Sequence, residues 1–294
     1  MNTQIRKACR FSLRRLSQVV SIFCIGKKNR EQCREWFDHK IIALYKNDIQ
    51  GFIDRYPRVW SEEETIKHLI DNRSSICRFG DGEFKLMVGE RHKSFQDVNH
   101  TLNNRMAEVL NSNHSNILIA IHPVRDFESL GRIWQKFIIR IGQPVLNMLD
   151  EKRTYPSMGV FRNLPKNAKA DLVARVRLIK QLWENRKIVL VVGKNSRFTF
   201  EQELFNNVQT VDYIYAPPKN AFEEYDNIIQ KVRAYNKEEY LILLVLGPTA
   251  TIMAYDLALE GYQAIDFGQM PGTYKQVKKE LFGDASTSLP ELSS

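Results

Sequence analysis

Short apolar segments alternate along this chain with longer segments in which apolar residues recur every three or four positions. The short segments predict strands buried on both faces, and they occupy residues 74–79, 116–122, 187–193, 211–217, 240–247 and 262–268. The longer segments predict helices, and they occupy residues 61–73, 97–112, 128–149, 166–185, 221–235 and 248–261. This alternation predicts an α/β fold with a mostly parallel sheet and helices on both of its faces.

Two of the predicted helices carry end signals. Ser61 is followed three residues later by Glu64, which is the spacing of a capping box at a helix N-terminus. Pro248 opens the last helix and Gly261 closes it, as is typical of helix ends. We therefore expect these two helices to begin next to Ser61 and at Pro248.

The first 35 residues differ from the remainder in charge. They hold nine Lys or Arg residues and two Glu residues, whereas the remainder holds 34 basic and 32 acidic residues. The net charge of +9 therefore belongs mainly to this segment, and the nearly neutral remainder argues against a nucleic-acid-binding surface. We divide the chain into a basic helical arm at residues 1–50, one domain at 51–284 and a disordered tail at 285–294.

The arm also carries an apolar stripe at helical spacing. The stripe consists of Ile5, Cys9, Leu13, Leu16, Val20 and Phe23, with Arg6, Arg10 and Arg14 alongside. A basic amphipathic helix of this kind either lies on an anionic membrane surface or packs on the protein body with its Arg side chains in solvent. No apolar run reaches the roughly 20 residues that a membrane-spanning helix needs.

The cysteines bear on the compartment. Cys9, Cys24, Cys33 and Cys77 form no C-x-x-C pair and have no His cluster beside them. This pattern argues against zinc and redox motifs and favours a reducing compartment. We therefore expect a cytoplasmic protein, which the basic arm would place at the inner membrane face if it binds lipid.

Polar residues follow four of the predicted strands. The segments are Arg78–Glu83, Gly193–Arg197, Pro217–Asn220 and Gly247–Ala250. Each segment alone is typical of a turn. Ligands of open α/β sheets, however, bind beyond the carboxyl ends of the strands. The four segments together therefore indicate a site for a phosphorylated ligand.

Two of these segments offer groups for phosphate. Gly247 joins a strand to a helix, and the free N–H groups at a helix start suit a phosphate. Thr249 or Thr251 would add a hydroxyl group there; the alternative is that Thr249 simply caps the helix. Lys194 and Arg197 either neutralise a diphosphate or are solvated loop charges.

Asp81 and Glu83 stand on either side of Gly82. On an extended or turning backbone both carboxylates would point to the same side, whereas on a helix they would point apart. Two carboxylates facing one way would suit Mg²⁺ or Mn²⁺ together with substrate phosphates. The alternative is that Asp81 caps a helix, which needs no metal.

Five segments of the chain resemble the GT-D-type glycosyltransferases, a family formerly described as a domain of unknown function. They are RFGDGE at residues 78–83, FQD at 95–97, VVGKNSRF at 191–198, PPKNAFEEYD at 217–226 and LGPTATIMAYDLALEGYQAIDFG at 246–268. The resemblance runs from about residue 60 to residue 282. It implies a Rossmann-like fold of its own topology and a nucleotide-sugar donor, usually a UDP-hexose.

The resemblance also assigns residues. The D-x-E motif of the family falls on Asp81 and Glu83, which implies that they contact Mn²⁺ or Mg²⁺ or the diphosphate. The residues predicted around the nucleotide are Arg78, Gly80, Lys194, Ser196, Arg197, Asn220, Gly247 and Thr249.

One stretch departs from the family. Members often continue the last strand with D-I-G-H and a downstream Glu, whereas this chain has Gln269 in place of the His and Thr273 in place of the Glu. A carboxylate that would activate the acceptor hydroxyl is therefore missing there. Asp266 is the predicted replacement base at the mouth of the crevice, with capping of the following turn as its alternative role. Further candidates are Asp97, Glu201 and Glu223.

These observations favour a metal-dependent glycosyltransferase that moves a hexose onto a hydroxyl group of a growing cell-surface glycan, carried on lipid or protein. One alternative is a non-catalytic subunit that binds nucleotide sugars, which Gln269 and Thr273 would suit. Another is a Rossmann-type enzyme that uses a dinucleotide or a methyl donor. The absence of G-x-G-x-x-G after any strand argues against the latter.

Overall fold

The computed structural model describes residues 3–90, 96–97 and 99–283. The chain forms two compact units, one from Met1–Tyr56 with Val124–Glu151 and one from Pro57–Pro123 with Lys152–Ser294. The predicted arm at residues 1–50 falls within the first unit, which residues 124–151 complete. The sequence division did not anticipate this second segment. The predicted tail at residues 285–294 lies outside the described residues.

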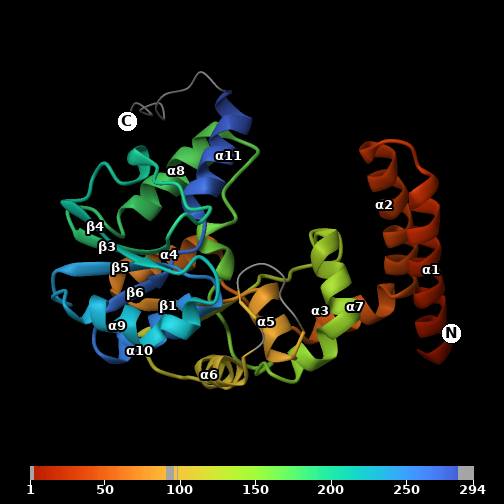
Figure 1. Ribbon diagram of the computed structural model, residues 1–294, viewed down its shortest axis with the longest axis horizontal. Helices are drawn as coiled ribbons and strands as arrows, with labels where there is room; N and C mark the ends of the chain where they lie inside the picture. Colours follow the sequence, from red (N-terminus) through yellow and green to blue (C-terminus); the bar gives the residue numbers. More distant parts are fainter. Residues whose placement is uncertain (1–2, 91–95, 98, 284–294) are drawn as a thin grey trace. The chain divides into compact units, whose positions relative to one another are not determined.

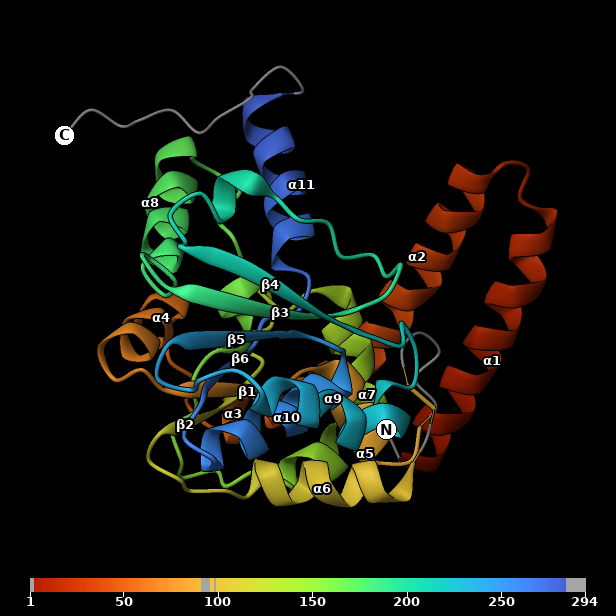
Figure 2. The same cartoon turned by 60° about the vertical axis from the view of Figure 1, so that its left-hand side comes forward.

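The second unit is built on one six-stranded sheet with the order β2-β1-β6-β5-β3-β4 (Figure 2). Its strands are β1 (Ser75–Phe79), β2 (Ile117–Ile121), β3 (Lys187–Gly193), β4 (Thr210–Ala216), β5 (Tyr240–Val245) and β6 (Gln263–Asp266). Each neighbouring pair runs parallel. The sheet confirms the predicted α/β fold and all six predicted strands. All carboxyl ends consequently meet at one edge.

Helices cover both faces of this sheet (Figures 1 and 2). The helices on one face are α4 (Glu62–Asp71), α8 (Lys169–Lys180) and α11 (Met270–Phe282), and those on the other are α9 (Tyr225–Arg233) and α10 (Pro248–Leu259). α6 (His100–Leu110) packs against both α10 and the short helix α5 (Asp81–Met87). Three short 3-10 helices also occur, η1 (Met158–Phe161), η2 (Gln202–Leu204) and η3 (Ala221–Glu224).

The predicted helix ends are confirmed in α4 and α10. The hydroxyl of Ser61 accepts a hydrogen bond from the Glu64 N–H at 3.1 Å, and the Glu64 carboxylate accepts one from the Ser61 N–H at 2.7 Å. Pro248 is the first residue of α10. The predicted helix at residues 221–235 begins instead as η3 and continues as α9.

The first unit is helical. It contains α1 (Thr3–Phe23), α2 (Lys27–Leu44), α3 (Lys46–Arg55) and α7 (Arg132–Leu146), and α1 and α2 lie side by side as a hairpin (Figure 1). Arg6 forms an ion pair with Asp48, and Arg10 donates to the carbonyl of Ile139 at 3.1 Å. None of the described helices is both long and apolar enough to cross a membrane.

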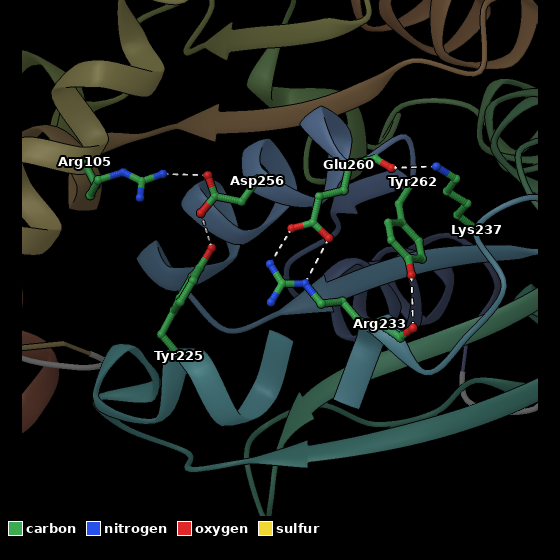
Figure 3. A network of polar contacts seen from close by, with 7 residues as sticks. All are labelled: Arg105, Tyr225, Arg233, Lys237, Asp256, Glu260 and Tyr262. Atoms are coloured by element: carbon green, nitrogen blue, oxygen red, sulfur yellow. Dashed lines mark hydrogen bonds and ion pairs between the residues drawn. The ribbon is translucent and has the colours of Figure 1, made fainter. Parts of the chain in front are cut away.

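Polar contacts fix α10 to α6 and α9 (Figure 3). Asp256 of α10 accepts hydrogen bonds from Arg105 at 2.5 Å and from the Tyr225 hydroxyl. One turn further along, Glu260 accepts two hydrogen bonds from Arg233, at 2.5 and 3.0 Å. The Asp256 side chain is 18% exposed, whereas those of Glu260 and Arg233 are 33% and 40% exposed. The Asp256 contacts are therefore the better shielded of the two sets.

This difference predicts unequal effects of two matched truncations. Asp256→Ala leaves the Tyr225 hydroxyl without its acceptor and takes one of two carboxylates from Arg105, which keeps Glu108, so it should lower the free energy of unfolding by about 2 kcal/mol. Glu260→Ala breaks a solvent-screened pair and should change stability little. Urea unfolding of both variants measures the difference, and equal losses would contradict the assigned role of Asp256.

Candidate functional site

A cleft of about 630 Å³ opens in the second unit beyond the carboxyl ends of β1, β5 and β6. Its polar walls include three arginines and three carboxylates, namely Arg78, Arg162, Arg197, Asp81, Glu83 and Asp266. The start of α10 and the first turns of α11 also line it, with Gly247 and Pro248 from α10 and Gly272, Thr273 and Gln276 from α11. A smaller cavity of about 100 Å³ shares Gly247, Gly268 and Gln269 with this cleft.

Arg78 and Asp266 form an ion pair that joins β1 to β6. Nη2 of Arg78 lies 3.0 Å from Oδ1 of Asp266, and the side chains are only 10% and 8% exposed. The Thr251 hydroxyl lies 3.3 Å from the other Asp266 oxygen and 3.2 Å from the Arg78 carbonyl. Burial raises the pKa of Asp266, and the Arg78 guanidinium opposes that rise. Asp266 is therefore a buried, engaged carboxylate rather than an open group at the mouth of the crevice.

Asp81 and Glu83 lie in the first turn of α5, not on extended backbone. The expectation that both carboxylates point to the same side of an extended strand is therefore wrong. Gly80 occupies the N-cap position, so the alternative in which Asp81 caps the helix is also wrong. The Glu83 carboxylate turns back and accepts a hydrogen bond from the Gly80 N–H at 2.9 Å. Asp81 forms an ion pair with Lys85, one turn along.

Burial, with the nearby Asp266 charge as a second cause, raises the pKa of Glu83 to about 7. Glu83 is half-buried, and its Oε2 atom accepts the Gly80 N–H, which leaves Oε1 as the oxygen that it could offer to a metal. Asp81 fits better, because its side chain is 29% exposed and lines the cleft. In residues 3–90, 96–97 and 99–283, no three His, Cys, Asp or Glu side chains gather as a metal-binding group. A cation held here would therefore depend on substrate phosphates for most of its ligands.

The start of α10 has the geometry predicted for it. Gly247 has φ 58° and ψ −139°, a conformation that favours glycine. The first N–H groups of a helix lack intrahelical acceptors. Gly247 and Pro248 border the cleft, but proline has no N–H, so Gly247 is the residue of this pair that offers a donor there. Thr249 does not cap the helix, because no side chain accepts a capping hydrogen bond there. Its buried hydroxyl oxygen has no hydrogen-bond partner among the described residues.

Other predicted site residues are distributed unevenly. Arg197 lines the cleft and Ser196 lines the smaller cavity. Lys194 is exposed. It is not among the described residues that line the cleft or the smaller cavity. Asn220 is likewise not among the described residues that line the cleft or the smaller cavity. It accepts a hydrogen bond from the Asp97 N–H at 3.0 Å and so fixes the end of the FQD segment.

Two predicted glycines have close neighbours. A Cβ atom on Gly80 would lie 2.9 Å from the Cε atom of Met158, the end of a flexible side chain that can move aside. One on Gly193 would lie 2.9 Å from the backbone Cα atom of Pro218, which closes the smaller cavity.

No sequence pattern indicated Arg162, Met158 or Phe161, which line the cleft from η1 and the residue that follows it. Their segment has no strand-end motif and reaches the cleft only through the tertiary fold. Thr251, the other hydroxyl expected at this helix start, lies one helical turn into α10 and contacts the Arg78 carbonyl and the Asp266 carboxylate.

The chain resembles solved structures over most of its length. A structure described as "The highly conserved domain of unknown function 1792 has a distinct glycosyltransferase fold" is 27% identical, with a TM-score of 0.73 over 84% of this chain and 89% of that chain. Residues 76–282 match the model of a protein family described as "Glycosyltransferase GT-D fold". The chain belongs to this GT-D family. The predicted resemblance and fold class are thereby confirmed.

Further relatives of this GT-D chain are streptococcal. A structure described as a new glycosyltransferase (DUF1792) from Streptococcus sanguinis is 25% identical, with a TM-score of 0.70 over 80% of this chain and 95% of that one. "Probable glycosyl transferase Gly" of Streptococcus gordonii is 27% identical over 76% of this chain and 33% of its own length. "Glycosyltransferase GlyD" of Streptococcus pneumoniae serotype 4 is 28% identical over 74% of this chain and 27% of its own length. The chain thus spans about a third or less of these curated relatives.

A substitution at Gly268, in the turn after β6, tests the Arg78–Asp266 pair of this GT-D chain. Gly268 has φ +62°, and a Cβ atom there would lie 2.2 Å from Nη2 of Arg78. Gly268→Ala should lower the free energy of unfolding by about 3 kcal/mol or more, because the left-handed conformation disfavours Ala and because displacing Arg78 breaks its buried pair with Asp266. Urea unfolding measures the loss.

Gly272→Ala is the matched control, since a Cβ atom on Gly272 meets nothing within 4 Å. It lies in helix α11, where Ala should be neutral or stabilising by about 0.5 kcal/mol. Equal free energies of unfolding for Gly268→Ala and Gly272→Ala would contradict the conclusion that the turn at Gly268 requires glycine.

Proposed function

We propose that this protein is a metal-assisted glycosyltransferase that moves a hexose from a nucleoside-diphosphate sugar, with a UDP-hexose as the expected donor, to a hydroxyl group of a growing cell-surface glycan. One observation carries the proposal: three arginines and the start of α10 line a single cleft at the carboxyl edge of the sheet in a GT-D chain. The names of the curated relatives support the same reaction class.

The charges in the cleft suit a departing diphosphate. Arg78, Arg162 and Arg197 approach from β1, from the end of η1 and from the loop after β3. Guanidinium groups bind phosphate oxygens in bidentate fashion. The start of α10 adds the Gly247 N–H and a positive dipole end. Fixed positive groups of this kind stabilise the negative charge that develops on the leaving group.

A divalent cation, Mn²⁺ or Mg²⁺, would offset part of the diphosphate charge when bound. Asp81 is the residue that would hold it, together with the donor phosphates. Lys85 neutralises Asp81 in the absence of a ligand, so this side chain would have to release Asp81 to the cation. Glu83 would support the site by fixing Gly80 and the start of α5.

The acceptor requires a base, and Asp266 remains our proposed one. It borders the cleft, and its raised pKa makes its carboxylate a stronger base than an exposed aspartate. Its contact with Arg78 favours a second role, that of positioning the arginine that would bind the diphosphate. The two roles predict different kinetics.

The alternative function is a non-catalytic subunit that binds nucleotide sugars. Gln269 and Thr273 support it, because they line the cleft where family members often carry His and Glu. Turnover of the donor separates the two functions.

The acceptor and the place of the reaction also belong to this proposal. The acceptor glycan would be carried on lipid or on protein, and the protein would work in the cytoplasm at the inner membrane face. We expect no nucleic-acid partner.

Donor binding tests the proposed site directly. UDP should raise the melting temperature, and more so with Mn²⁺. Asp81→Asn should remove most of the additional Mn²⁺ effect, because the amide is a poor metal ligand, while binding of UDP alone persists through the arginines. Asp126→Asn, an exposed aspartate of the first unit, is the control. No shift with any nucleoside diphosphate would overturn the proposal, and shifts without hydrolysis or transfer would favour the non-catalytic subunit.

Asp266→Asn should separate base from positioning residue. As a base, its loss should lower the transfer rate at saturating donor by about 10²-fold or more and leave donor affinity near wild type. If Asp266 only holds Arg78, donor affinity should fall while transfer at saturating donor changes little. Initial rates over a range of donor concentrations distinguish the two, and unchanged kinetics would remove Asp266 from the reaction.

A further inference from the structure

The exposed apolar side chains of the first unit concentrate where α1 turns into α2. Ile22, Phe23 and Ile25 are 72%, 79% and 87% exposed, and Val19, one turn earlier, is 53% exposed. We call these four residues the hairpin tip. Single exposed apolar side chains are ordinary on protein surfaces, but a contiguous group usually marks a contact surface.

The orientation of α1 explains why these side chains face outward. Arg6 pairs with Asp48 and lies over the Tyr45 ring, and Arg10 donates to the Ile139 carbonyl. The basic residues of the first turns thus hold α1 against its own unit. The sequence alternative, a helix packed through its apolar stripe with arginines in solvent, is therefore wrong for Arg6 and Arg10. From Arg10 to Phe23 the helix extends about 20 Å, which carries the tip away from this attachment.

The charged residues nearest the tip along the chain are basic, and Glu31 is the first acidic residue beyond them. Residues 1–30 contain eight Lys or Arg residues and no Asp or Glu. Those nearest the tip along the chain, all exposed, are Arg14, Arg15, Lys27, Lys28 and Arg30. An apolar tip surrounded by cations matches an interface that is negatively charged at its surface and apolar beneath it.

We propose that the hairpin tip docks on an anionic lipid surface. The apolar side chains would enter the boundary between headgroups and acyl chains, and the surrounding cations would contact lipid phosphates. The hairpin would lie in the interface without crossing it. The inference uses only the first unit, so it can fail or hold independently of the proposed glycosyl transfer.

A second copy of the chain is the main competing occupant. Its tip would bring an equal set of cations against the first, and no acidic residue in residues 1–30 would offset the repulsion. Like charges placed together oppose association. Charge therefore favours lipid over self-association.

The test is flotation of the full chain with vesicles. Binding should require phosphatidylglycerol in phosphatidylcholine vesicles and should weaken with salt. Lys27→Gln with Lys28→Gln should lower the partition coefficient by about thirtyfold, and Phe23→Ser with Ile25→Ser by at least about tenfold. These measurements need neither donor nor acceptor, so an inactive enzyme does not affect them.

Matched controls show whether the position matters. Ile133→Ser removes a side chain of the same unit that is also 72% exposed, and Lys166→Gln with Lys231→Gln removes two exposed lysines of the other unit. Both controls should bind like wild type. Equal loss in the controls, or unchanged binding of the tip variants, would overturn the proposal. A dimer in light scattering that Phe23→Ser with Ile25→Ser converts to monomers, without vesicle binding, would overturn it in favour of a second copy.

Discussion

The ion pair between Arg78 and Asp266 is the contact on which the geometry of the cleft depends. It connects β1 and β6, which are neighbours in the sheet although they are far apart in sequence. A buried charge that loses its partner is strongly destabilising. The two side chains therefore require each other, and through them β1, α10 and the turn after β6 are held in register. The arginine that faces the cleft is fixed before any ligand arrives.

The three carboxylates that line the cleft all make contacts within the protein itself. Glu83 holds the N-terminus of its own helix, Asp266 holds Arg78, and Asp81 is paired with Lys85. The Asp81–Lys85 pair is more exposed than the Arg78–Asp266 pair, so a ligand can rearrange it at a lower free-energy cost. The site thus combines an arginine, Arg78, that a buried ion pair holds in place with one carboxylate, Asp81, that can exchange its partner for a ligand.

The apolar runs were sufficient to predict the parallel sheet, because a strand that is buried on both faces is apolar along nearly its whole length. Arg78, Arg197 and Gly247 were predicted because they follow strands directly. The backbone at Asp81 was not predicted, since a single helical turn after Gly80 is too short to show a period. Arg162 was missed because its segment reaches the cleft only through tertiary packing, and the attachment of Arg6 to Asp48 was missed because a partner 42 residues away leaves no local pattern.

The first unit is assembled from two segments of the chain, so three backbone connections, after residues 56, 123 and 151, join it to the second. A unit inserted in this way is not a detachable appendage. Removing residues 1–56 would leave α7 behind, with Phe137, Ile141 and Val145, all buried at present, deprived of the helices α2 and α3 that contact α7. The apolar face so uncovered would make the shortened chain prone to aggregation. Any evolutionary gain or loss of this unit must therefore involve both segments together.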